Sequence, residues 1–428
     1  MLKSGQEIEL TVEKAAAGGR MIARYDGQVV LVAATLPGER VRARVERADK
    51  RLAFATTVAV LEPSPDRRIG FEDGRCGGCV FSHINYPRQT TLKSEIVRDA
   101  FLRIGRIPLA DAVPIEGSPE AGYRMRARFH VVRGRAGFYR EATHQWCDAQ
   151  PTGQLRTDSL RIVQAVADGV AAAGAQAVSI ELNENLAATE RAIAVEIDRI
   201  PEAFDPGAPS LRDADAAATL RGIVLRDPSG RTASHGAPLV RDDLASLTNG
   251  RASAGDLVRH PDAFFQANRF LVPPLVAAVV DAVPASGPIV DLYAGVGLFS
   301  VALAATGVRG IVAVEGDPVS GADLQQNAAR FEGALTTKLT AVEEALPSLP
   351  REATAIVDPP RTGMSPQAIA ALLARKPSRV VYVSCDPATM ARDARKLLDA
   401  GYTLASLRGF DFFPNTPHVE SLGVFNRA

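Results

Sequence analysis

A single thiol stands at the end of an apolar, β-branched run near the C-terminus. The run is Arg379 to Val383, and the turn after it reads Ser384-Cys385-Asp386-Pro387. In open α/β sheets, ligands bind at the carboxyl ends of the strands. A free thiol has a pKa near ~8.5, so a nucleophilic cysteine needs activation by its surroundings. The position of Cys385 predicts covalent catalysis, although an isolated cysteine is more often a small hydrophobic residue of the core.

Two carboxylates stand where they could serve that thiol. Asp358 opens Asp358-Pro359-Pro360-Arg361 after the apolar run Ala355–Val357, and its two prolines make the turn rigid. Glu420 follows a segment rich in aromatic residues and prolines, and burial there would raise its pKa and suit it to proton abstraction. The alternatives are a plain rigid turn for Asp358 and, for Glu420, a surface glutamate that opens the last strand. We expect both at the sheet edge of Cys385.

A glycine turn lies upstream of these residues. It contains Asp291, Tyr293, Gly295 and Gly297, follows an apolar run and precedes a helix at Leu298. Glycines let the backbone approach a ligand closely, and an acid about twenty residues on, here Glu315, can bind ribose hydroxyls. The third glycine of dinucleotide-binding turns is absent, which favours S-adenosylmethionine over NAD. The alternative is a glycine turn without a ligand.

A cysteine pair stands much earlier in the chain. Cys76-Gly77-Gly78-Cys79 has the spacing of a metal or cluster hairpin, and Cys147 could be a third ligand. Two unligated thiols explain the spacing equally well.

The elements that must position these residues fall into three parts. Residues 1–62 contain closely spaced short strands, which predicts a small β-barrel. Residues 63–260 are mixed, with a helix over 91–104, strands over 126–132 and 192–197, and little to interpret over 206–256. From residue 261, the strands 288–292, 310–314, 355–357 and 380–383 alternate with helical stretches such as 321–330 and 366–375. The fold class is therefore α/β, with a doubly wound parallel sheet that follows a mixed α+β domain and an OB-like barrel.

Composition limits the function classes. The chain has 428 residues, 46% hydrophobic and 23% charged, as in soluble globular proteins. The N-terminus has no apolar signal region, and the most apolar stretch, 270–283, is broken by prolines and an aspartate, which predicts no membrane span. Four cysteines are too few for a disulfide scaffold, which predicts a reducing cytoplasm.

Charge is balanced overall but uneven locally. The formal net charge is zero, yet residues 75–140 contain twelve Lys/Arg and five Asp/Glu. Such an excess can form a phosphate-facing patch or only a solvated face.

The motifs together resemble the RNA uridine-C5 methyltransferase family, whose members carry an N-terminal TRAM barrel and an iron–sulfur central domain. The residues that carry this resemblance span nearly the whole chain: Gly18-Gly19, Leu36 to Val41, Ser64 to Arg67, Cys76 to Cys79, Phe264-Phe265-Gln266-Ala267-Asn268, Asp358 to Arg361, Ser384 to Thr389 and His418 to Ser421.

The resemblance implies formation of 5-methyluridine in RNA from S-adenosylmethionine. Cys385 would add to C6 of the uracil, Glu420 would remove the C5 proton, and Asp358 would orient the flipped base. The methyl donor would be held by these residues: Gln266, Asp291, Tyr293, Gly295, Gly297, Glu315 and Asp358. As in TRAM-containing bacterial members, 23S ribosomal RNA is the expected substrate, and tRNA is the alternative. We also expect a cytoplasmic monomer.

Some positions depart from the family pattern. The family's [4Fe-4S] ligands would include positions held here by Gly70 and Thr152, so Cys76, Cys79 and Cys147 form an incomplete set. Asp386 stands where the family has an asparagine. Such erosion is compatible with a non-catalytic RNA-binding or ribosome-assembly factor. The retention of Cys385, Glu420, Asp358 and Gln266 argues instead for an enzyme.

Overall fold

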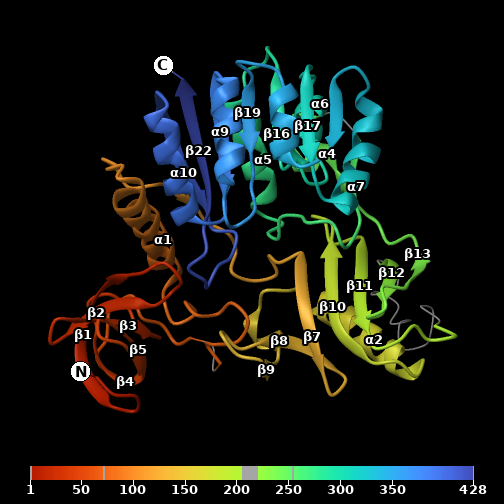
Figure 1. The fold of residues 1–428 in the computed structure, drawn as a ribbon. Coiled ribbons are helices and arrows are strands. Elements are labelled where there is room, and N and C mark those ends of the chain that lie inside the picture. Colours follow the sequence, from red (N-terminus) through yellow and green to blue (C-terminus); the bar gives the residue numbers. More distant parts are fainter. Residues whose placement is uncertain (1, 71–72, 205–219, 253–254, 428) are drawn as a thin grey trace.

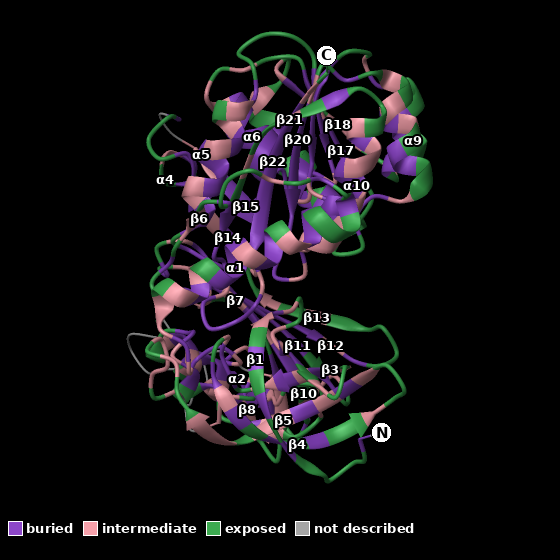
Figure 2. Cartoon of the chain, turned by 90° about the vertical axis from the view of Figure 1, so that its left-hand side faces the viewer, coloured by how far each residue is buried: buried purple, intermediate pink, exposed green. Residues whose placement is uncertain are grey.

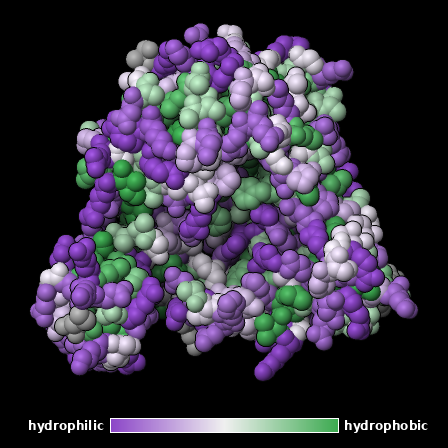
Figure 3. All heavy atoms as spheres, in the orientation of Figure 1, coloured by the Kyte–Doolittle hydropathy of each residue, from purple (hydrophilic) through white to green (hydrophobic). Residues whose placement is uncertain are grey.

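The computed structural model describes residues 2–70, 73–204, 220–252 and 255–427. A small barrel, a central sheet and a C-terminal sheet with helices follow one another along the chain (Figure 1). The surface is hollowed where these three parts meet (Figure 3). Within the described ranges, no helix combines the length and the apolar character needed to cross a bilayer.

The N-terminal part is a closed barrel in the order β1-β2-β3-β5-β4. Alternate residues of a strand point to opposite faces. In β1, Ile8, Leu10 and Val12 therefore enter the core, while Glu7, Glu9 and Glu13 stay exposed. The expected barrel is thus confirmed. Its strands are β1 (Glu7–Ala15), β2 (Met21–Tyr25), β3 (Gln28–Ala33), β4 (Arg40–Ala48) and β5 (Leu52–Glu62).

The central part is a seven-stranded sheet with helix α2 (Thr157–Ala172) packed on one face. Ala127 and Phe129 of β7 join the core under α2, whereas Arg128 between them is exposed. A two-stranded sheet and a short helix, α4 (Leu244–Leu247), follow. The strands are β7 (Arg126–Val132), β8 (Arg135–Tyr139), β9 (Trp146–Cys147), β10 (Ala177–Glu184), β11 (Arg191–Ile197), β12 (Leu220–Arg226), β13 (Thr232–Gly236), β14 (Val240–Asp243) and β15 (Asp256–Arg259).

The C-terminal part is an eight-stranded sheet in the order β18-β17-β16-β19-β20-β22-β21-β6. β16 to β20 are parallel, and β22 runs antiparallel between β20 and β21. The strands are β6 (Ile115–Glu116), β16 (Ile289–Leu292), β17 (Ile311–Glu315), β18 (Leu335–Leu339), β19 (Thr354–Val357), β20 (Arg379–Ser384), β21 (Tyr402–Phe410) and β22 (Glu420–Arg427).

Helices cover both faces of this sheet. Ile289 and Ile356 pack into a core with α5 and α6, while their neighbours Val290 and Val357 pack into a second core with α9 and α10. Strands buried on both faces are expected of a parallel sheet, and Figure 2 shows β20 and β22 as almost wholly buried. The predicted doubly wound fold is therefore confirmed. The helices are α5 (Val272–Ala282), α6 (Leu298–Ala305), α7 (Pro318–Ala328), α8 (Val342–Ala345), α9 (Pro366–Arg375) and α10 (Pro387–Asp399).

One helix connects the barrel to the C-terminal sheet. α1 (Tyr86–Ala100) contributes Leu92 and Ile96 to the barrel core and Val97 to the core of the C-terminal sheet. A π-helical turn, Phe101–Gly105, continues α1 towards α10, and β6 then adds an edge strand beside β21. Residues 86–116 therefore fold onto a sheet whose other strands begin at residue 289.

Candidate active site

The three residues proposed for chemistry meet at one edge of the C-terminal sheet. Asp358 follows β19 and Cys385 follows β20, so both lie at the carboxyl ends of neighbouring parallel strands. Glu420 opens β22, whose antiparallel pairing sets Ser384 opposite Ser421. Glu420 is therefore returned to the edge where β20 ends, although almost forty residues separate the two strands in sequence.

The environment of Cys385 opposes ionisation of its thiol. Burial, followed by the charges of Glu420 and Asp358, raises the pKa of Cys385 to about 12, and Arg361 acts in the opposite direction. The thiol form therefore dominates at neutral pH in the absence of a substrate. Arg361 belongs to the turn Asp358-Pro359-Pro360-Arg361 after β19, and its charge makes it a further candidate for stabilising the thiolate.

The two carboxyl groups share this low-dielectric edge. Burial raises the pKa of Asp358 to about 7, opposed by a hydrogen bond from Gln266 Nε2 at 3.5 Å. Burial, and then the charge of Asp358, raises the pKa of Glu420 well above its usual value. Glu420 is 4% exposed, and its Oε1 has no hydrogen-bond partner among the described residues. A buried, unpartnered carboxyl oxygen is costly unless it serves a ligand or a proton transfer.

The glycine turn lies at the same edge, between β16 and α6. Tyr293, Gly295 and Gly297 all adopt positive φ, at 62°, 56° and 94°. A Cβ on Gly297 would lie 2.8 Å from Val301 Cγ2, so the turn requires glycine there for space as well as for conformation. Glu315 at the end of β17 accepts the Gly295 amide at 2.7 Å, which joins the turn to the predicted ribose-binding acid.

Asp291 lies beneath this turn. It is fully buried and accepts the Ser300 amide at 3.0 Å, which ties the end of β16 to the first turn of α6. Burial raises its pKa to about 7. Its contacts are those of a residue that shapes the turn, and any direct contact with a ligand stays a prediction.

Asp386, which stands where the family has an asparagine, still caps the N-terminus of α10. Its side chain accepts the amides of Ala388 and Thr389, both at 2.9 Å, and so caps α10. Aspartate and asparagine serve equally well at this position of a helix.

Residues missed by the sequence analysis hold the segment before Glu420. Gln89 of α1 donates to the Asn415 side chain and accepts the Asn415 amide, at 2.9 and 2.8 Å. Lys93 of α1 forms a fully buried ion pair with Asp411 and donates to the Phe413 carbonyl. More than 300 residues separate these partners in sequence, so no local pattern could have indicated them.

The three remaining cysteines do not fit an iron–sulfur cluster. Cys76 and Cys147 are joined by a disulfide, which the sequence analysis did not predict. Burial raises the pKa of the Cys79 thiol to about 12. Thr152 donates its hydroxyl to the Ala149 carbonyl, and a Cβ on Gly70 would lie 3.0 Å from the His83 amide nitrogen. The residues present therefore lack both the number and the state of thiolates that a [4Fe-4S] cluster requires.

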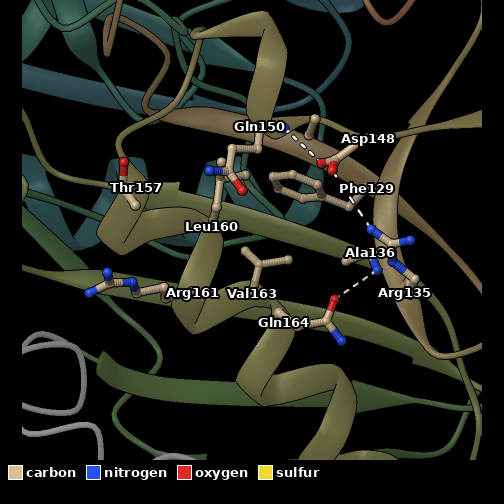
Figure 4. Close-up of a pocket in the computed structure, with 11 residues that line it drawn as sticks. Phe129, Arg135, Ala136, Asp148, Gln150, Thr157, Leu160, Arg161, Val163 and Gln164 are labelled. Atoms are coloured by element: carbon tan, nitrogen blue, oxygen red, sulfur yellow. Dashed lines mark hydrogen bonds and ion pairs between the residues drawn. The ribbon is translucent and has the colours of Figure 1, made fainter.

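A pocket of about 480 Å³ lies elsewhere, between the central sheet and α2 (Figure 4). Phe129, Leu160 and Val163 form its apolar wall, and Arg135 and Arg161 lie at its margin. It contains none of the residues proposed for chemistry.

The fold and the edge of the C-terminal sheet define a methyltransferase of the class that uses S-adenosylmethionine. Comparisons with known proteins agree with this class. The family model for tRNA (uracil-5-)-methyltransferase matches residues 349–428, and the TRAM domain model matches residues 2–58. An uncharacterized RNA methyltransferase of Streptomyces coelicolor is 32% identical, with 99% of this chain and 93% of the relative covered. A second, from Nitratidesulfovibrio vulgaris, is 30% identical, with 98% and 96% covered.

A solved structure has the same fold over nearly the whole chain. The Pyrococcus abyssi tRNA (uracil-54, C5)-methyltransferase, in complex with S-adenosyl-L-homocysteine, matches with a TM-score of 0.73 and 23% identity. The match covers 97% of this chain and 100% of that one. The chain belongs to the RNA (uracil-5-)-methyltransferase family and carries a TRAM domain.

Proposed function

We propose that the chain methylates C5 of a uridine in RNA through a covalent adduct between Cys385 and C6 of the uracil. One observation carries this proposal: Cys385, Asp358 and Glu420 reach one sheet edge from three strands, and Glu420 keeps an unpartnered buried oxygen there. C5 of uracil is a poor nucleophile, and addition of a thiolate to C6 makes it carbanion-like.

The chain's own residues account for the proton movements. As sulfur bonds to C6, the proton of the Cys385 thiol passes to the Asp358 carboxylate, and it returns when the thiolate leaves; the charge of Arg361 favours the thiolate. C5 then takes the methyl group of S-adenosylmethionine, whose sulfonium–methyl bond breaks so that S-adenosylhomocysteine is the leaving group. A Glu420 oxygen receives the C5 proton, the sulfur–C6 bond breaks, and the double bond re-forms. Asp358 orients the uracil, consistent with its raised pKa, which makes it a donor as well as an acceptor near pH 7.

The methyl donor would lie between the glycine turn and Gln266. The positive φ of Gly295 and Gly297 lets the backbone approach such a ligand closely, and the carboxylate of Glu315 and the side chain of Gln266 supply the polar groups that it needs. The metal site is left out of this scheme, because Cys76, Cys79 and Cys147 do not fit a cluster.

We favour 23S ribosomal RNA as the substrate, with tRNA as the second candidate. The second candidate is supported by the Pyrococcus abyssi neighbour, which acts on tRNA. We further propose that residues 1–62 and 63–260 hold the RNA while residues 261–428 hold the methyl donor, and that the chain works as a cytoplasmic monomer. The hollow between these parts supports this division (Figure 3).

The test is transfer of labelled methyl groups from S-adenosylmethionine to unmodified 23S rRNA and tRNA transcripts. We expect 5-methyluridine in the rRNA, and loss of transfer in Cys385→Ala. The matched control is Cys79→Ala, which removes the other free thiol among the described residues. Label on tRNA alone would show that the substrate is tRNA and would leave the proposed chemistry intact. Normal transfer by Cys385→Ala would overturn the proposal of a covalent Cys385 adduct.

A further inference from the structure

Aromatic side chains gather at one end of the central sheet. The rings of His130 on β7 and Tyr139 on β8 are stacked, with centroids 3.7 Å apart and planes 4° from parallel. The exposed His144 meets Tyr139 edge-on at 5.5 Å, and Trp146 of β9 pairs with Tyr139. We call His130, Tyr139, His144 and Trp146 the aromatic row.

The backbone leaves room for the row. His130 is paired with Gly137, and a Cβ on Gly137 would lie 2.4 Å from Trp146 Nε1. The indole therefore rests against the strand where a side chain would otherwise stand. The Arg135 guanidinium lies 4.8 Å from the centre of the indole ring, a cation–π distance.

The row lies on the face of the sheet opposite α2. Ala127 and Phe129 of β7 pack under α2, so the alternate residues Arg128, His130 and Val132 face the other way. Arg128 and Val132 are exposed, and His130 is partly exposed. Burial, Arg128 and His144 lower the pKa of His130, so this ring stays neutral at pH 7.

The same strand leads from the row to the candidate active site. Arg126 of β7 lies with its guanidinium 5.3 Å from the centre of the Phe264 ring, and Phe264 is two residues before Gln266. His130 lies four residues further along, roughly 13 Å at the rise of a strand. That distance corresponds to a few nucleotides of an extended RNA strand.

Charge on this hairpin suits a polyanion. Residues 124–140 contain six arginines and no acid. Carboxylates elsewhere in the chain pair with four of these arginines, namely Arg126, Arg128, Arg135 and Arg140. Arg124 and Arg133 have no carboxylate partner among the described residues. Arg124 packs against Phe138 and Gln154, so the exposed Arg133 alone leaves a modest positive excess on the hairpin.

We propose that the aromatic row binds unpaired bases of the RNA strand that flanks the target uridine, by stacking. Stacking on aromatic rings is tolerant of sequence and needs bases that are free of a duplex. The modest charge excess also favours base stacking over phosphate contacts as the main source of affinity. This inference rests on the proposed RNA substrate, and it adds where on the protein the strand runs.

The chain carries its own reporter for this surface. Trp146 is the only tryptophan in 428 residues. We expect saturable quenching of its emission by a 12-nucleotide oligouridylate and none by an RNA duplex of equal length. Unchanged Trp146 emission at saturating oligouridylate would overturn the proposal.

Substitutions separate stacking from folding. Labelled oligouridylate should bind Tyr139→Ala and His130→Ala about 5- to 150-fold more weakly, whereas Tyr139→Phe, which keeps the ring, should bind as wild type does. The matched control is His235→Ala, a histidine on β13 at the opposite edge of the same sheet. Equal affinity of Tyr139→Ala, His130→Ala and His235→Ala would overturn the proposal.

Methyl transfer distinguishes the two proposals. If the wild-type protein methylates RNA and the Tyr139→Ala and His130→Ala variants keep its KM for RNA, the proposal that the aromatic row binds RNA is wrong and the proposed function stands. If wild type methylates neither transcript but oligouridylate still quenches Trp146, the function is wrong and the RNA surface stands.

Discussion

Cys385 combines a nucleophilic atom with surroundings that keep it protonated. Burial and two neighbouring carboxyl groups hold its pKa near 12, while Arg361 partly offsets them. Such an arrangement protects the thiol when no RNA is bound, because the thiolate is the form that oxidants and metals attack. Reactivity then depends on a substrate that changes the charge balance at this edge.

The first prediction concerns pH. Because the fraction of thiolate rises tenfold per unit below the pKa, kcat/KM for methyl transfer should increase with pH from 7 to 9 without a plateau. The pKa of Asp358, near 7, adds ionised carboxylate in the lower part of this range. The measurement is initial rates at low RNA concentration, with S-adenosylhomocysteine affinity at each pH as control. A plateau reached by pH 7 would contradict the high pKa of Cys385.

At the scale of elements, turns fix where the ligand groups point. The glycine turn after β16 brings three consecutive odd-numbered residues to positive φ, and the last of them packs against α6 and α7. A comparison of two glycines in the C-terminal part separates the effect of this packing on stability from the effect of backbone strain. Gly297 and Gly307 have nearly the same φ, 94° and 93°, but only Gly297 is enclosed.

The second prediction compares those glycines. Gly307→Ala should cost about 1 kcal/mol of unfolding free energy from backbone strain alone. Gly297→Ala should cost more, because its Cβ would also meet Val301 and Leu324, and it should lose affinity for S-adenosylhomocysteine. Denaturant titration and calorimetric binding test this. Equal stability and equal S-adenosylhomocysteine affinity in the two variants would contradict this prediction, because they would show that the turn can shift to accommodate a Cβ at position 297.

The third prediction concerns the cysteines. The disulfide fixes the loop before Cys79 to β9, where the family would place a cluster. Unfolded, unreduced protein should therefore contain two titratable thiols, Cys79 and Cys385, and four after reduction. Purified protein should show no iron–sulfur absorbance. Four thiols before reduction, together with bound iron, would contradict this arrangement.

Local patterns predicted several elements of the structure but not how distant ones meet. The bounds of β7 and α9 match the expected 126–132 and 366–375, because apolar periodicity and a proline at the first helical turn are local signals. β12 to β14 were missed in a Gly- and Asp-rich stretch, and 205–219 lies outside the described residues. Cys385 and Asp358 could be placed at one edge of the sheet because each follows the end of an apolar strand in the sequence. Glu420 needed the antiparallel pairing of β22, which is a tertiary property.

At the scale of the whole molecule, α1 couples the barrel to the edge of the C-terminal sheet that carries the chemistry. Gln89 and Lys93 contact the segment 411–415, and Leu92 and Ile96 of the same helix enter the barrel core. If the barrel binds RNA, as proposed, a displacement of the barrel would therefore be transmitted by α1 to the segment that precedes Glu420.

The fourth prediction tests that connection. Lys93→Met should lower the unfolding free energy by about 3–5 kcal/mol, because Asp411 would remain buried without its cation. The double variant Lys93→Met/Asp411→Leu should recover much of this loss. Denaturant titration gives both values. A double variant no more stable than the single one would show that the loss comes from packing rather than from the unpaired charge.

The position of α1 also has a consequence for synthesis on the ribosome. The helix is complete by Ala100, but its partner helix α10 begins only at Pro387. At about 5–20 residues per second, this interval lasts on the order of 15–60 s. During that time Val97 and Phe101 have no sheet to cover them. The nascent chain therefore exposes these two apolar side chains until α10 and the C-terminal sheet have been synthesised.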